Sequence, residues 1–215
     1  MICVSLGGCA VDTCLDLLRS LDFAEIRLDM MDVSVPAVER IFSVSTPTIA
    51  TCRPGRYDEE TRKELLMAAI DAGARYVDLE LESDRDYRQE LLEYGHARGC
   101  EVIVSFHDYE RTPRREELAA LAGRIFSAGA DIGKIAAMTE TPADSARLLG
   151  LLGVAEYAGR LVVVGMGEAG KITRIAAPFL GSPFTYASPS EEAKTASGQI
   201  SERKMRELRR LIQNA

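Results

Sequence analysis

The stretch "VIVSFHDYERTPRREELAALAGRIFSAGADIGKIAAM" (residues 102–138) predicts a strand, a helix and a second strand. Its first part, residues 102–107, is a short apolar run rich in β-branched residues, which is typical of a buried strand. Residues 113–129 have helical periodicity, and they begin with a proline and end with a glycine, the usual start and stop signals. A second apolar run, residues 131–138, follows, so the unit favours two parallel strands joined by a helix.

The same alternation recurs along the chain of 215 residues. Eight short apolar runs predict strands at residues 2–6, 24–30, 47–53, 76–82, 102–107, 131–138, 161–167 and 183–188. Further helices are expected over residues 12–21, 59–73 and 141–159. Asp12 and Thr141 are the candidate N-caps of the first and last of these helices. Eight strand–helix repeats predict a (β/α)8 TIM barrel, a fold whose lower size limit is about 200 residues.

An open, doubly wound parallel sheet is the alternative fold. That fold usually carries a glycine-rich nucleotide loop with the spacing G-x-G-x-x-G after an early strand. Residues 5–13, "SLGGCAVDT", contain Gly7 and Gly8 but lack that spacing. Because no linker or low-complexity tract divides the chain, we expect residues 1–215 to form a single catalytic barrel domain.

Composition excludes several classes of function. The formal net charge of −7 argues against binding to nucleic acid or to anionic membranes, which requires a basic face. No apolar stretch is long enough to span a membrane, and the N-terminus lacks the basic start of a signal peptide. Five cysteines without a C-x-x-C pair suggest buried thiols in a reduced, cytoplasmic protein. The two histidines have no second ligand at zinc-like spacing, so no metal site is expected.

Polar residues recur in five consecutive predicted strands, although most of these strands are otherwise apolar. They are Glu25, Arg27, Asp29, Arg53, Asp78, Glu80, Glu82, His107 and Lys134. Alternate strand residues share a face, so the three in the second strand should point the same way, as should the three in the fourth. Buried charges are costly unless they are paired. The set is either a group of structural ion pairs or a functional cluster, and its origin in consecutive strands favours the cluster.

Lys134 lies in the middle of the sixth predicted strand and allows three interpretations. Its ammonium extends to solvent, it pairs with Glu80, or it is a nucleophile. Burial and nearby cations would favour a neutral amine, which can attack a carbonyl and form a Schiff base. Arg27, Arg53 and His107 are the candidate neighbours.

His107 ends the fifth predicted strand, next to the strand of Lys134. Neighbouring strands lie about 5 Å apart, so the two side chains are expected to be partners. A neutral imidazole beside an imine could remove a proton and later return it, whereas the structural alternative is a hydrogen bond to a loop carbonyl. After the eighth strand, residues 188–200 form either a lid over a ligand or a connector to the last helix.

Several of these motifs together resemble one known family. They are "EIRLD" (25–29), "TCR" (51–53), "YVDLELE" (76–82), "SFHDYERTP" (105–113), "ADIGKIA" (130–136), "GMGEAGKITRIAAPFLGSPFTYAS" (165–188) and "TASGQI" (195–200). In this order they resemble type I 3-dehydroquinate dehydratase over nearly the whole chain. The resemblance implies a barrel that dehydrates 3-dehydroquinate to 3-dehydroshikimate in the shikimate pathway, without metal or cofactor. It also suggests a homodimer, and no fused shikimate dehydrogenase is expected because the chain ends soon after its last predicted helix.

The resemblance implies roles for individual residues. Lys134 would form an imine with the C3 ketone, and His107 would be the general acid and base. The implied substrate contacts are Ser5, Glu25, Arg27, Arg53, Arg174, Thr195 and Gln199. Arg174 would hold the substrate carboxylate, a role that suits a planar fork with two donors, and Gln199 and Thr195 would belong to the lid. Asp78 and Glu80 match inner acidic positions that orient or pair other groups.

Two positions depart from the family's pattern. Tyr57 stands where many members have a glutamate that supports the histidine, which leaves Glu59, Glu60 or Glu80 as substitutes. Ser197 stands where a proline is common before the lid glycine, so the lid is expected to be more flexible.

Two other functions remain open at the level of sequence. A lysine-imine aldolase would use the same Lys134 to cleave a carbon–carbon bond, with "GMGEAGK" (165–171) as a candidate phosphate site. A catalytically silent barrel that only binds a small acid or a protein is the third alternative. The presence of both Lys134 and His107 at strand ends argues against it.

Overall fold

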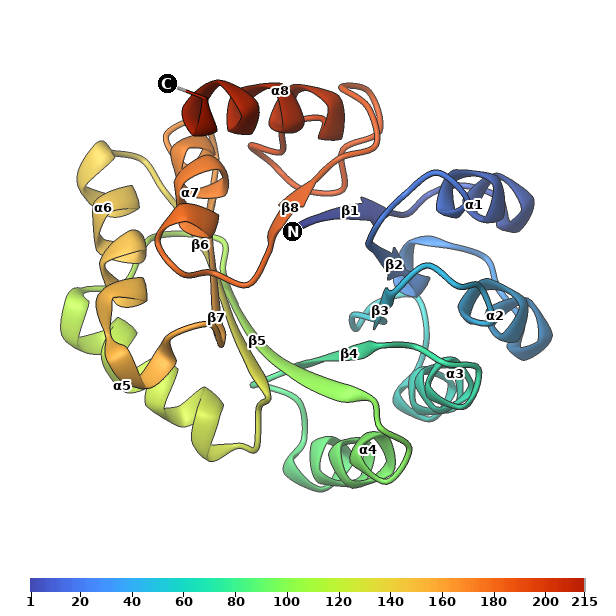
Figure 1. Cartoon of the computed structure of the whole chain (residues 1–215). Coiled ribbons are helices and arrows are strands. Elements are labelled where there is room, and N and C mark those ends of the chain that lie inside the picture. The colour runs from blue at the N-terminus through green and yellow to red at the C-terminus, as the bar shows by residue number, and fades with distance from the viewer. Residues whose placement is uncertain (215) are drawn as a thin grey trace.

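The computed structural model describes residues 1–214, and its eight strands form one parallel sheet. The strands are β1 (Ile2–Leu6), β2 (Ala24–Arg27), β3 (Thr48–Thr51), β4 (Tyr76–Glu80), β5 (Glu101–Asp108), β6 (Ile132–Met138), β7 (Leu161–Met166) and β8 (Thr185–Ala187). Their hydrogen-bonded order is β7-β6-β5-β4-β3-β2-β1-β8. The sheet curves until β7 and β8 lie next to each other, so the barrel is nearly closed (Figure 1). The (β/α)8 barrel is confirmed, and the open sheet is excluded.

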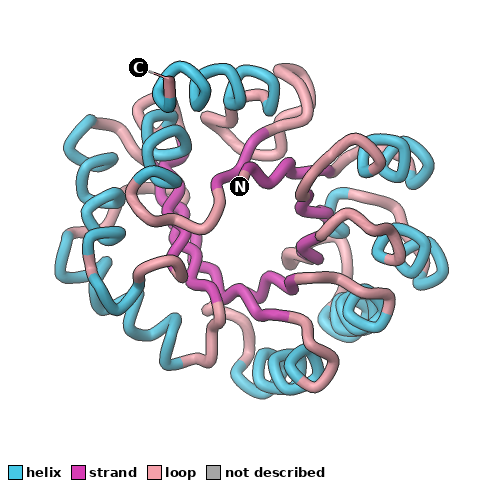
Figure 2. Tube along the Cα trace, in the orientation of Figure 1, coloured by secondary structure: helices cyan, strands magenta, loops and turns pink. Residues whose placement is uncertain are grey.

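The helices form a ring around the strands, as Figure 2 shows. They are α1 (Val11–Leu18), α2 (Val35–Phe42), α3 (Glu59–Asp71), α4 (Arg85–His96), α5 (Arg115–Ser127), α6 (Pro142–Gly150), α7 (Lys171–Ala176) and α8 (Glu202–Gln213). No helix within residues 1–214 combines the length and the apolar character that a membrane crossing requires. All five cysteines are free; four are buried, as expected, and Cys9 is only half-buried.

Three local expectations about helices and strands are corrected. The N-cap of α1 is Ala10, and Asp12 instead lies in the first turn, where its negative charge interacts favourably with the helix dipole. Helix α6 does begin with Thr141 as its cap, but it ends at Gly150 and is followed by two 3-10 turns. Gly150 and Gly153 weaken a continuous helix there. Strand β2 ends at Arg27, so Asp29 lies in a 3-10 turn (Leu28–Met30).

The barrel interior is layered along its axis. An apolar layer of buried residues includes Cys3, Ile49, Ile103, Val162 and Phe184. Side chains two residues further along a strand point to the same face and form the next layer toward the carboxyl ends. On β5 and β6 that layer holds Ser105 and Lys134, which are register partners. The alternation of the strands therefore directs polar side chains inward just above an apolar floor.

Candidate active site

A cavity of about 200 Å³ opens at the carboxyl ends of the strands. Eight of the nine residues predicted from the sequence as catalytic or substrate-binding residues line this cavity. They are Glu25, Arg27, Arg53, His107, Lys134, Arg174, Thr195 and Gln199. The ninth, Ser5, is fully buried and donates a hydrogen bond to Glu25 Oε2 at 2.5 Å. The structure thus brings together residues that are spread over almost the whole chain.

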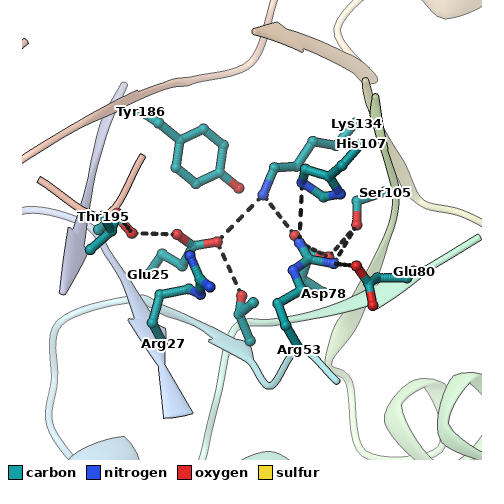
Figure 3. Close-up of polar contacts among 12 residues, drawn as sticks. Glu25, Arg27, Arg53, Asp78, Glu80, Ser105, His107, Lys134, Tyr186 and Thr195 are labelled. Carbon is teal, nitrogen blue, oxygen red and sulfur yellow. Dashed lines mark hydrogen bonds and ion pairs between the residues drawn. The ribbon is translucent and has the colours of Figure 1, made fainter. Parts of the chain in front are cut away.

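Lys134 is buried at the base of this cavity, with 5% of its surface exposed. Its Nζ forms ion pairs with Asp78 Oδ2 at 2.8 Å and with Glu25 Oε1 at 3.4 Å, as Figure 3 shows. Extension to solvent is therefore wrong, and so is pairing with Glu80. The carboxylate of Glu80 instead lies 3.2 Å from Arg53 Nη1.

Two buried carboxylates surround the amine and keep their negative charge. Burial alone would raise the pKa of Asp78, but the charges of Arg53 and Lys134 outweigh it and hold the pKa below its usual range. Burial likewise opposes ionisation of Glu25, and the charges of Lys134 and Arg27 again lower the pKa. A positive charge at the Lys134 nitrogen is therefore compensated from two sides.

His107 lies on β5, one inward position above the level of Lys134. It is the register partner of Ala136, whereas Lys134 faces Ser105. Burial, followed by the charges of Arg53 and Lys134, lowers the pKa of His107 well below its usual range. The imidazole is therefore neutral at physiological pH and can accept a proton. The predicted neighbourhood of the two residues is confirmed, and no hydrogen bond joins them within the described chain.

The two ring nitrogens of His107 differ in their surroundings. Nε2 lies 3.5 Å from Arg53 Nη2, and because a guanidinium only donates, this contact requires Nε2 to be the acceptor. Nδ1 is buried and has no hydrogen-bond partner among residues 1–214. The alternative of a bond to a loop carbonyl is therefore wrong. The ring of Tyr109 stacks on the imidazole at a centroid distance of 6.1 Å.

None of the predicted substitutes for the missing glutamate forms a hydrogen bond with His107 in the described structure. Glu59 and Glu80 line a surface depression beside the imidazole, and Glu80 is paired with Arg53. Glu60 pairs with Lys63. Tyr57 has a different role, because its hydroxyl donates to Met31 O at 2.8 Å and accepts from Val33 N at 3.2 Å.

Arg174 is a buried cation of a different kind. It is 1% exposed, and its Nη atoms donate only to the carbonyl oxygens of Tyr186 (3.5 Å) and Ser197 (3.2 Å). Its Nε has no partner among the described residues. Burial lowers the pKa of Arg174 to about 10, and Glu25 is the charge that opposes this effect. A buried guanidinium without a carboxylate partner in the described chain is a strong site for an anionic group.

Close backbone packing places Arg174 above the cavity. A Cβ on Gly165 of β7 would lie 2.7 Å from the Cα of Gly170, so these two glycines allow α7 to approach the strand. Gly165 N also donates to Thr173 Oγ1 at 2.7 Å. The short helix α7 is thus held firmly against the barrel.

The loop after β8 covers the cavity. Thr195 Oγ1 donates to Ser5 Oγ at 2.9 Å, and Gln199 Oε1 accepts from Thr195 N at 2.8 Å. Through Ser5, the loop is connected by hydrogen bonds to Glu25 and then to Lys134. This arrangement favours the lid over the simple connector.

The prediction that the charged residues of one strand share a face holds for some residues only. Arg27 lines the cavity and forms a two-bond contact with Asp29 at 2.6 and 3.0 Å, although Asp29 lies beyond the strand. Glu82 is likewise outside β4 and is exposed. Lying within a strand is not required for joining the cluster, because Arg53 follows the end of β3 and still lines the cavity and pairs with Asp78 at 2.9 Å.

Sequence reasoning missed three neutral residues of the inner network. Ser105 Oγ donates to Asp78 Oδ1 at 2.6 Å, and Thr51 Oγ1 donates to Glu25 Oε1 at 3.1 Å. The ring of Tyr186 lies 4.2 Å from Lys134 Nζ. Ser105 could have been found from its spacing of two residues before His107. Within residues 1–214, no three His, Cys, Asp or Glu side chains are grouped as metal ligands.

Comparison with known proteins identifies the relatives of this chain. A family model described as type I 3-dehydroquinase matches residues 2–215. The 3-dehydroquinate dehydratase of Desulfotalea psychrophila is 38% identical over 220 residues, covering 95% of each chain. The crystal structure of 3-dehydroquinate dehydratase from Aquifex aeolicus is similar over the full length of both chains, with a TM-score of 0.84 and 29% identity. Type I 3-dehydroquinate dehydratase from Clostridium difficile has the same fold, with a TM-score of 0.87 and 24% identity over 99% of this chain and 92% of that one.

Proposed function

The chain belongs to the type I 3-dehydroquinase family, and from this premise we propose that it dehydrates 3-dehydroquinate through an imine on Lys134. The observation that supports the proposal most is the position of Lys134. Its amine is buried at the base of a cavity, and a neutral histidine lies one position higher on the adjacent strand. An amine and a base in this arrangement suit attack on a carbonyl followed by proton removal from the neighbouring carbon.

Arg174 binds the carboxylate of the substrate. Its guanidinium faces the cavity and has no carboxylate partner among the described residues, so a bound carboxylate supplies the missing charge. Ser5, Glu25, Arg27, Arg53, Thr195 and Gln199 complete the proposed set of substrate contacts and supports. The lid residues Thr195 and Gln199 close over the ligand and exclude water.

The protons and electrons of imine formation balance when the reaction starts from the protonated amine of Lys134. His107 takes one proton from Nζ, and the neutral amine attacks the C3 carbonyl carbon while the π electrons move onto the oxygen. The oxygen leaves as water with two protons that came from Nζ, one of them carried by His107. The iminium retains one N–H, and its charge is compensated by Asp78 and Glu25.

The iminium then acts as an electron sink for the dehydration. His107 removes a proton from C2, and the electrons of that bond move toward the nitrogen and form an enamine. These electrons return to expel the C1 hydroxyl, which leaves as water after His107 delivers the proton. A water molecule hydrolyses the conjugated iminium, which releases 3-dehydroshikimate and restores Lys134.

The other expectations from the sequence stay predictions. They are one catalytic domain over residues 1–215, a cytoplasmic setting, a homodimer, and activity without metal or cofactor. The aldolase and the silent binding barrel are the competing functions that the experiment must separate.

The test is incubation of the protein with 3-dehydroquinate, with and without borohydride. Turnover produces a conjugated enone that is followed by its absorbance, and borohydride reduces the imine to a stable secondary amine. Intact mass should show one adduct, and peptide mapping should place it on Lys134. No adduct and no enone would reject the dehydratase, whereas an adduct formed with a phosphorylated sugar would favour the aldolase.

A substitution of Arg174 tests the carboxylate site. Arg174→Met should raise KM about 100-fold, because hydrogen bonds to charged groups contribute about 1.5–3 kcal/mol each. The ligand-free variant should unfold at the same or a higher temperature, since a buried cation without a carboxylate partner has been removed. Arg174→Lys keeps the charge but lacks the fork, so its KM should lie between those of wild type and Arg174→Met. A folded Arg174→Met protein with the wild-type KM would remove Arg174 from this role.

A further inference from the structure

Tyr186 is a buried phenol in the cavity, and the proposed chemistry leaves its hydroxyl without a role. The residue lies on β8 and is 4% exposed. Its Oη is buried and has no hydrogen-bond partner among residues 1–214, although buried tyrosine hydroxyls usually have one. Figure 3 shows the hydroxyl end of the ring directed toward the space between Glu25 and Lys134.

The ring of Tyr186 lies directly beside the amine. The centroid of the Tyr186 ring lies 4.2 Å from Lys134 Nζ. The backbone of Tyr186 is the register partner of Cys3 on β1, and its carbonyl oxygen accepts a hydrogen bond from Arg174. These contacts fix the backbone that carries the phenol, and the ring distance places the phenol beside the amine.

The phenol is a donor rather than a base. Burial is the main cause that raises the pKa of Tyr186 well above its usual range, and the charge of Glu25 adds to it. The hydroxyl keeps its proton at physiological pH, so it needs an acceptor that a ligand brings into the cavity.

Attack by the amine creates such an acceptor. When Nζ bonds to a carbonyl carbon, the carbonyl oxygen is two bonds from Nζ and gains the π electrons. The side chains that pair with Nζ, Asp78 and Glu25, are carboxylates, and they repel this developing negative charge. A donor already aimed at this space stabilises the charge without reorganisation.

We propose that the Tyr186 hydroxyl donates a hydrogen bond to the ketone oxygen during attack by Lys134, and that it is a catalytic residue for imine formation. The phenol keeps its proton throughout, and the electrons and protons move as described for the imine above. The same contact acts in reverse when water hydrolyses the product imine. This inference rests on the proposed function, because it requires a ketone that reacts with Lys134.

The experiment compares Tyr186→Phe with a matched control, Tyr87→Phe. Tyr87 on α4 is also buried (6% exposed) with an unpartnered hydroxyl among the described residues, and its ring packs against Arg62 outside the cavity. The rate of adduct formation is measured in a single turnover by quenching into borohydride at increasing times. Tyr186→Phe should slow this rate about 100-fold, whereas Tyr87→Phe should equal wild type. Both variants should unfold at or above the wild-type temperature, since each loses an unsatisfied polar atom.

The outcomes separate this inference from the proposed function. If the wild-type protein forms no adduct, the proposed function fails, and this inference fails with it. If wild type forms the adduct and Tyr186→Phe forms it equally fast, the function stands and the role of Tyr186 is wrong. A raised KM with an unchanged adduct rate would also overturn the role of Tyr186, since its hydrogen bond would then already be made to the bound substrate before attack. A clear loss of thermal stability in Tyr186→Phe alone would show a structural hydrogen bond instead.

Discussion

Lys134→Ala is expected to lower kcat by about 10⁴-fold or more and to abolish the borohydride adduct with 3-dehydroquinate. No other described amine can take its place, because Lys134 is the lysine that lines the cavity. The variant should also be less stable, since Asp78 and Glu25 lose the ammonium that they share. Turnover, adduct mass and thermal unfolding together measure these effects.

Two variants separate lost chemistry from lost folding. Lys204→Ala removes an exposed lysine of α8 and should keep wild-type turnover and a single adduct. Lys134→Arg retains a cation for both carboxylates but cannot form an imine, because a guanidinium stays protonated. A folded Lys134→Arg protein that still turns over substrate would show that the imine is not part of the reaction.

His107→Ala should lower kcat by about 10²- to 10⁴-fold, and an adduct on Lys134 should still form, but more slowly, because water must then take the Nζ proton that His107 takes in wild type. Without its base, the imine loses the C2 proton only slowly, so the trapped adduct should mainly retain the water that wild type eliminates. Intact mass distinguishes the two adducts directly. Added imidazole should restore part of the turnover if the missing group acts as a base.

The control for this prediction is His96→Ala. His96 is on α4, pairs with Asp131 at 2.7 Å, and lies outside the cavity, so its loss should not change kcat.

The pH profile of the wild-type protein also tests His107. The acidic limb of kcat/KM should lie below about pH 6.5, because a lowered pKa keeps His107 neutral there. A wild-type limb above that pH, or a fully active His107→Ala protein, would contradict the assignment.

The fold was predictable because it depends on local patterns. Eight apolar runs separated by helical segments allow few architectures, and the eight strands were located to within a few residues. The errors occurred at the ends of helices and strands, where a few local residues decide whether the regular structure continues. Gly150 ends a helix that periodicity alone would continue, and the chain leaves β2 at Arg27 two residues before Asp29.

The partners of the charged residues were much less predictable. Sequence spacing assigns a face to each strand residue, but a pairing across the barrel depends on closure and on side-chain length. Lys134 therefore contacts Asp78 and Glu25 rather than Glu80, which is held by Arg53. The sequence also could not show which residue supports His107 in place of the usual glutamate. The residue at that position, Tyr57, donates its hydroxyl hydrogen bond to Met31 O instead.

By itself the sequence determined the barrel, the family motifs and the identity of the reactive candidates, because these follow from periodicity and residue type along the chain. Tertiary structure alone decided the electrostatic environment of those candidates. Burial and nearby cations lower the pKa of His107, two carboxylates pair with Lys134, and Arg174 is left without a carboxylate partner within the described residues. These properties depend on distances between strands that are remote in sequence, and the curvature of the whole barrel sets those distances.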